Sequence, residues 1–145
     1  MKKQIVTIKY KRPFFWKILK IFFPAYDPDG TVAVAFGRFV YANMDIPEDY
    51  QVHESTHLRQ HCYSYFVAVF WWILYLFSKR FRYSQELEAF REQYKWIIVN
   101  QPFWRHKKLD EYAHQLSSEL YGSIVTFDQA REQIKKRHID NSQTL

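Results

Sequence analysis

Five consecutive residues, His53-Glu54-Ser55-Thr56-His57, constrain the fold of this chain more than any other stretch. Side chains four residues apart lie on one face of a helix, so His53 and His57 can aim both imidazole rings at one metal ion. Glu54 can reach a water molecule on that ion without being a ligand, which suits a general base. The pattern therefore predicts a helix that holds zinc, rather than an ordinary helix with a polar patch, and it requires a third ligand elsewhere in the chain.

The length and the cysteine content limit the classes of protein to which this chain can belong. The chain has 145 residues, which suits a single domain, predicted over residues 1–138 with a flexible tail at 139–145. Cys62 is the only cysteine, so an internal disulfide and a disulfide-stapled secreted domain are excluded. The basic N-terminus is not followed by an apolar run with a cleavage site, so we expect a cytoplasmic protein, with membrane association as an alternative.

The chain is basic, and this charge bears on its partners. Twenty-one Lys and Arg residues oppose 15 Asp and Glu residues, which gives a net charge of +6. Neither a glycine-rich phosphate loop nor a recognised nucleic-acid motif accompanies the charge, so we predict no specific nucleic-acid partner. An anionic membrane surface or an acidic protein partner would suit it equally well.

Two segments near the N-terminus carry contrasting patterns. Residues 4–11 alternate between apolar and polar side chains, which predicts a half-buried strand. Residues 13–23 lie between two prolines and are apolar apart from Lys17 and Lys20, which predicts a helix. A core helix with two snorkelling lysines is favoured there over a helix that lies on a membrane.

A hairpin should precede the histidine helix. A turn at 27–30, a strand over 31–36, a tight turn at 37–38 and a short strand over 39–41 are expected from their turn residues and β-branched or aromatic side chains. Its edge strand is a candidate for pairing with an extended peptide. Pro47 and the carboxylates after it then indicate the start of the histidine helix.

The remainder of the chain is predicted to be mostly helical. Residues 62–77 carry no charge, and as a helix they would span about 24 Å, less than the roughly 30 Å of a bilayer core. A buried central helix is therefore favoured over a membrane span or a membrane-surface segment. Further helices are expected over 85–100 with Ser84 as the cap, over 109–120, and from the capping box at Thr126 to about Lys136. The predicted fold class is mainly helical α+β, with a small antiparallel sheet or hairpin.

Helical phase selects the third ligand. Glu86 and Glu88 both lie in the helix predicted over 85–100, but residues two apart point to opposite sides. Glu86 shares its face with apolar side chains, whereas Glu88 shares its face with charged ones. A carboxylate that faces a core needs a partner, and a zinc ion held by His53 and His57 would be one. A buried ion pair or hydrogen bond is the alternative.

These two segments resemble the gluzincin group of zinc metallopeptidases, especially the small minigluzincins and short phage or bacterial members. Glu86-Leu87-Glu88-Ala89 is similar to the downstream Glu-x-x-Ala of the CAAX-prenyl-protease-type and ImmA/IrrE-type enzymes. The resemblance covers residues 47–95, about a third of the chain, and implies that Glu86 is the third zinc ligand in a zincin-like fold. Phe90 stands where those families usually carry Asp or Asn. The resemblance also implies a Tyr or His that stabilises an oxyanion, for which the candidates are Tyr83, Tyr94 and His114.

If Glu86 is the third ligand, the chain between His57 and Glu86 must return to the metal. A straight helix from His57 to Phe77 would end about 30 Å from the metal. The assignment therefore requires either an extended return over residues 78–84, or a break near residues 61–65 after which the helix doubles back. A straight helix followed by a tight helical hairpin at 78–83 would contradict it. His61, one turn beyond His57, is expected to be a second-shell or surface residue.

The expected function is hydrolysis of a peptide or protein substrate by a zinc-activated water, with Glu54 as the base. A zinc-stapled structural protein that contributes to a phage assembly or binds a membrane is the alternative. In that case aromatic and basic surfaces would contact a membrane or a protein assembly.

Overall fold

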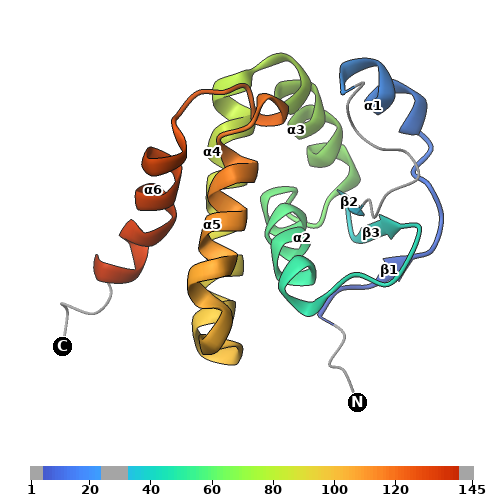
Figure 1. Ribbon diagram of the computed structural model, residues 1–145. Coiled ribbons are helices and arrows are strands. Elements are labelled where there is room, and N and C mark those ends of the chain that lie inside the picture. The colour runs from blue at the N-terminus through green and yellow to red at the C-terminus, as the bar shows by residue number, and fades with distance from the viewer. Residues whose placement is uncertain (1–4, 24–32, 141–145) are drawn as a thin grey trace. The chain divides into compact units, whose positions relative to one another are not determined.

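The computed structural model describes residues 5–23 and 33–140, and the chain divides into two compact units, 1–77 and 78–145. The first unit contains β1 (Ile8–Lys9), α1 (Trp16–Phe22), β2 (Ala33–Phe36), β3 (Phe39–Ala42), α2 (Glu48–Gln60) and α3 (Tyr65–Phe77) (Figure 1). The second contains α4 (Lys79–Asn100), α5 (Arg105–Leu116), α6 (Phe127–Asp140) and the short 3-10 helices η1 (Pro102–Trp104) and η2 (Glu119–Tyr121). This confirms the mainly helical α+β class; the single domain over 1–138 stays a prediction.

The sheet of the first unit is mixed rather than purely antiparallel. Its strand order is β1-β3-β2, with the predicted hairpin joining β2 to β3 in antiparallel register and β1 pairing parallel to β3. The strand predicted over 4–11 is reduced to two residues, and the turn predicted at 27–30 lies outside the described residues. Gly37 forms the hairpin turn with φ +63°, and the Tyr65 ring would lie 2.4 Å from a Cβ there. Only glycine fits this position.

The histidine helix begins where its proline and carboxylates predict, directly after Pro47. The Gln51 side chain donates to the Ile46 carbonyl (3.1 Å) and accepts from the Ile5 amide (2.9 Å), which ties the first turn of α2 to the chain before it. The helix ends where Cys62 and Tyr63 adopt left-handed φ values of 51° and 52°. These two residues turn the chain sharply without a glycine.

After this break, α3 begins at Tyr65 and packs one ring against the C-terminal end of α2. The Trp71 ring of α3 contacts both His57 (5.4 Å between centroids) and His61 (4.6 Å). The Trp72 indole donates to the Ala35 carbonyl of β2 at 3.2 Å. The predicted break near 61–65 is therefore confirmed, but α3 does not double back along α2. The alternative of an extended return over 78–84 is wrong because that segment is helical.

The boundaries of α4 and α5 differ from the prediction. The helix expected over 85–100 begins at Lys79, where the Ser78 hydroxyl accepts from the Phe81 amide (3.2 Å). Ser84 is therefore not the cap, and its hydroxyl donates to the Phe81 carbonyl inside the helix (2.8 Å). The helix expected over 109–120 covers 105–116 instead.

The capping box that opens α6 is confirmed. The Gln129 amide donates to the Thr126 hydroxyl (3.3 Å), and the Thr126 amide donates to the Gln129 side chain (3.0 Å). The helix runs beyond the predicted end at Lys136 to Asp140. The last five residues of the expected tail lie outside the described part.

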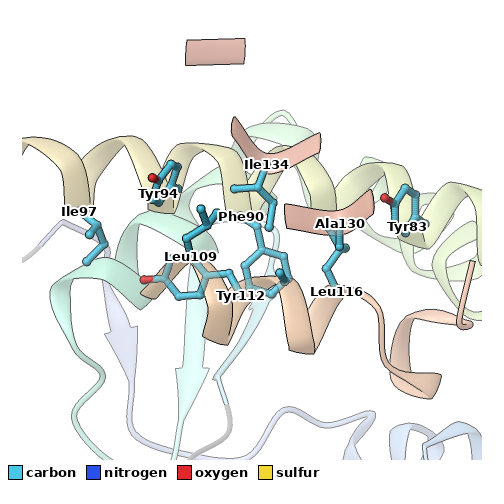
Figure 2. Close-up of a cluster of buried hydrophobic side chains, with 10 residues drawn as sticks. Tyr83, Phe90, Tyr94, Ile97, Leu109, Tyr112, Leu116, Ala130 and Ile134 are labelled. Carbon is cyan, nitrogen blue, oxygen red and sulfur yellow. The ribbon is translucent and has the colours of Figure 1, made fainter. Parts of the chain in front are cut away.

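Helices α4, α5 and α6 share one apolar core. Ten buried residues form it, among them Phe90, Ile97, Leu109, Tyr112 and Leu116 (Figure 2).

Glu86 and Glu88 fall on the sides of α4 that helical phase predicts. Glu86 is buried with Phe90 on its side, whereas Glu88 is partly exposed. Within the described residues, no helix is both long enough and apolar enough to cross a bilayer.

Candidate metal site

Helix α2 buries polar side chains. His53, Glu54 and His57 are all buried, although a helix normally turns its apolar side chains inward. The other two residues of the motif use their hydroxyls within the helix: Ser55 and Thr56 both donate to the Val52 carbonyl, at 2.7 and 3.1 Å. The other three side chains of the motif, two imidazoles and one carboxylate, are of the types that bind metals or transfer protons.

The two imidazole rings face each other through the same ring nitrogen. Nε2 of His53 lies 3.2 Å from Nε2 of His57. On its other side, Nδ1 of His57 donates to Oε1 of Gln60 at 2.8 Å. A neutral imidazole carries one proton, so this bond leaves Nε2 of His57 with a lone pair directed toward His53. Metal-binding histidines are commonly oriented by such a bond from the second nitrogen.

Glu86 completes the group. Among the described residues, His53, His57 and Glu86 form one group of three that could hold a metal ion. One ligand atom of each lies within 4.8 Å of those of the other two, and all three residues are buried. The three residues that the sequence predicts as ligands therefore lie close enough to bind one ion.

The donor set fits a small divalent ion. Two nitrogens bound at 2.0–2.1 Å to a tetrahedral zinc would be about 3.3 Å apart, and the Nε2 atoms of His53 and His57 lie 3.2 Å apart. Two imidazoles and one carboxylate are also the ligand types that zinc accepts at sites with an open fourth position.

His61 lies one helical turn beyond His57 and is fully buried, so the expectation of a surface position is wrong. Neither of its ring nitrogens has a hydrogen-bond partner in the part of the chain that the structure describes. Burial, with a smaller contribution from the charge of His57, lowers the pKa of His61 to about 3. The ring is therefore neutral at physiological pH, and its contact is with Trp71, which also contacts His57.

The three candidates for stabilising an oxyanion have contacts within the second unit. The Tyr83 hydroxyl donates to Oε1 of Gln133 at 2.7 Å, and Tyr94 belongs to the apolar core. His114 is exposed and its ring packs against Phe127 (4.3 Å between centroids). These contacts account for each side chain, and the oxyanion role stays a prediction.

Two residues of the site were missed by sequence reasoning. Gln60 lies three residues after His57, and helical spacing alone could have identified it as a partner. Trp71 is brought to His57 by the break at residues 61–64, which has no local glycine or proline signal.

The hairpin edge proposed for peptide pairing is partly occupied, because the Ala35 carbonyl of β2 accepts a hydrogen bond from the Trp72 indole.

No family model, no curated protein and no solved structure matches this chain.

Proposed function

We propose that this chain is a zinc-dependent metallopeptidase with a zincin-like site. The observation that supports it is the group of His53, His57 and Glu86, whose ligand atoms lie within 4.8 Å of one another. The order of these residues in the chain agrees, since a glutamate directly follows the first histidine. Such a glutamate is placed to act as a base beside the metal in H-E-x-x-H peptidases.

Each residue has a role under this proposal. Zinc, when bound, supplies a Lewis acid that polarises a carbonyl and makes water more acidic. Glu54 accepts the proton of the attacking water and returns it to the leaving amine. Gln60 holds the His57 ring in the tautomer that presents Nε2, and Trp71 packs against that ring. Burial of the histidines and Glu54 keeps bulk water away from these groups.

Metal content is the first test. The purified protein should bind close to one equivalent of zinc, whereas His53→Ala and Glu86→Ala should lose most of it. Glu88→Gln is the matched control, because Glu88 lies on the same helix, is partly exposed and should not affect binding. Elemental analysis after exhaustive dialysis measures the content. If Glu86→Ala keeps full zinc affinity, Glu86 is not a ligand.

Activity is the second test. Glu54→Gln should keep the zinc and lose at least about a hundredfold in turnover, as expected when a general base is removed. Hydrolysis of a mixed peptide library, read by mass spectrometry with and without a chelator, measures it. A parent protein that binds zinc fully and cleaves no peptide would indicate the alternative, a structural metal. Equal turnover by Glu54→Gln and parent would exclude Glu54 as the base.

Replacing Gln60, which orients His57 without being a ligand, should weaken zinc binding only in part. Gln60→Ala removes the acceptor that orients His57, and loss of such a partner typically weakens metal affinity by about 10–100-fold. Competition with a fluorescent zinc chelator measures the affinity. Ser55→Ala is the control, since its hydroxyl bonds only within α2 in the described contacts. Equal affinities for Gln60→Ala and parent would show that Gln60 does not orient the ring.

A further inference from the structure

Helix α3 presents an apolar stripe to solvent. Its exposed apolar residues follow helical spacing, at positions i, i+4, i+7 and i+11: Phe66, Phe70, Ile73 and Phe77. The end residues are the most exposed, at 73% for Phe66 and 74% for Phe77. The opposite face of α3 is already buried through Ala68, Trp71 and Tyr75. The buried face already packs α3 into the first unit, so the exposed stripe is not part of that packing.

Helix α1 and the residue pair before it present a second stripe. Phe14, Ile18 and Ile21 are spaced by four and three residues, and Phe14 and Ile21 are 81% and 77% exposed. Trp16 and Leu19 of the same segment point inward. A ring contact between Phe22 and Phe77, 5.3 Å between centroids, connects the C-terminal ends of α1 and α3. The two helices lie side by side (Figure 1), and their shared buried cluster includes Trp16, Leu19 and Trp72.

The Phe22–Phe77 contact joins the two stripes. We call them together the α1/α3 face: Phe14, Ile18, Ile21, Phe66, Phe70, Ile73 and Phe77. Scattered exposed apolar residues are ordinary, but a contiguous patch of large side chains marks a binding surface. Both helices are apolar on nearly their whole circumference. A helix with this pattern is expected inside a protein or at a lipid boundary.

The charged side chains on α1 and directly before it are all cations. Lys17 and Lys20 are exposed on α1, and no Asp or Glu occurs before Asp27 in the chain. Helix α3 carries no charge at all. Exposed Lys11 and Arg12 precede α1. Apolar side chains flanked by these cations complement anionic lipid headgroups above an acyl layer.

We propose that the α1/α3 face docks on the surface of an anionic lipid bilayer, with both helices in the plane of the interface. A full span is not available to α3, whose 13 residues extend about 20 Å against a hydrocarbon core of about 30 Å. Self-association through the same face is disfavoured, because a two-fold interface would place the lysines of both copies in one apolar region. Lipid phosphates satisfy those lysines instead.

The proposal concerns binding, and it holds whether or not the metal site hydrolyses peptides. Its location is nevertheless informative, since Trp71 on the inner side of α3 contacts the His57 ring while Phe70 on the outer side is exposed. One helix, about 10 Å wide, separates the docking face from a metal-binding histidine.

Vesicle cosedimentation tests the proposal with the full chain. The parent should bind vesicles of 70% phosphatidylcholine and 30% phosphatidylglycerol, and Phe66→Ser/Phe70→Ser should lose at least tenfold in partition coefficient. The control is Val99→Ser/Phe103→Ser, which replaces two apolar residues of the second unit that are at least as exposed and should bind as the parent does. His53→Ala should also bind normally. Circular dichroism checks that all variants remain folded.

The charges and the alternative occupant are tested separately. Lys17→Gln/Lys20→Gln should reduce binding to the anionic vesicles about tenfold, and binding to pure phosphatidylcholine less than twofold. Analytical ultracentrifugation without lipid should give a monomer. A parent that ignores anionic vesicles overturns the proposal. So does a dimer that Phe66→Ser/Phe70→Ser dissociates, because the occupant of the face is then a second copy of the chain. Equal loss in the Val99→Ser/Phe103→Ser control would also overturn it.

Discussion

The two compact units bury different kinds of side chain. The second unit has one contiguous apolar core, and few of the large apolar side chains that the structure shows exposed belong to it. The first unit divides its core among three smaller clusters, exposes most of those large apolar side chains and buries a run of polar ones on α2. Burying polar groups and exposing apolar ones both cost stability, and the metal site and the docking face proposed above would account for both.

The largest expected effect on stability comes from comparing a buried phenylalanine of the second unit with an exposed one of the first. Phe90→Ala in the core of the second unit should lower the free energy of unfolding by about 3–5 kcal/mol, because it leaves a cavity. Phe66→Ala in the first unit should change it by less than about 0.5 kcal/mol, since Phe66 is 73% exposed and Phe90 only 1%. Urea denaturation followed by circular dichroism measures both. Similar losses in the two variants would show that the α1/α3 face is covered within the protein.

Acidification should destabilise the first unit through His61. The folded pKa of His61 is about 3, below the ordinary value of about 6.5, so between these values the unfolded chain binds a proton that the folded chain does not. Stability should therefore fall as the pH drops from 6.5 toward 3, by about 1.4 kcal/mol per pH unit from this residue.

The His61→Leu variant isolates that contribution. It should be more stable than the parent by about 1 kcal/mol at pH 7, because two unsatisfied buried nitrogens are removed, and its stability should decline less steeply with acid. Urea denaturation at pH 7, 6 and 5, with chelator present throughout, compares the slopes. The other histidines contribute to both proteins and cancel in the difference. Parallel slopes would mean that His61 is not held neutral.

The sequence was informative where local chemistry sets the structure. The start of α2 after Pro47 and the capping box at Thr126 were both predicted from residue types whose backbone preferences are strong. Glu86 was selected over Glu88 by phase within one helix, and the burial of the two residues follows that order. These predictions succeeded because they depend on spacing along a single helix.

Predictions failed where tertiary contacts decide. Ser78 and Ser84 are equally good caps by type, and the helix starts at the first of them. The break after α2 was inferred only from the distance that the chain must cover between His57 and Glu86, because Cys62 and Tyr63 carry no turn signal. The pairing of β1 parallel to β3 is likewise a long-range contact. The outward stripe of α3 could not be separated from its buried one, since both consist of large apolar residues.

The glycines of the two units offer an intermediate test. Gly37→Ala should cost about 2 kcal/mol, because φ is +63° and the new methyl would overlap the Tyr65 ring. Gly122→Ala in the second unit also has positive φ, but its nearest neighbour is the flexible Lys79 side chain at 3.1 Å, so the cost should be smaller. The combined change Gly37→Ala/Tyr65→Ala should recover the part due to overlap. Denaturation midpoints measure all three, and a larger loss for Gly122→Ala would reverse the order.

The smallest effect concerns the break between α2 and α3. Cys62 holds φ 51° without being glycine, which costs about 1 kcal/mol, and its side chain is exposed. Cys62→Gly should therefore stabilise the protein by about 0.5 kcal/mol, since the added freedom of the unfolded chain offsets part of the relief. Ser123→Gly is the counterpart in the second unit, with φ 50°. Zinc affinity should change less than about twofold in both variants, because the break is held by other bonds, including Tyr63 N to Leu58 O at 3.0 Å. A large loss of zinc in Cys62→Gly alone would show that this strained turn, and not only the packing of Trp71, positions the histidine.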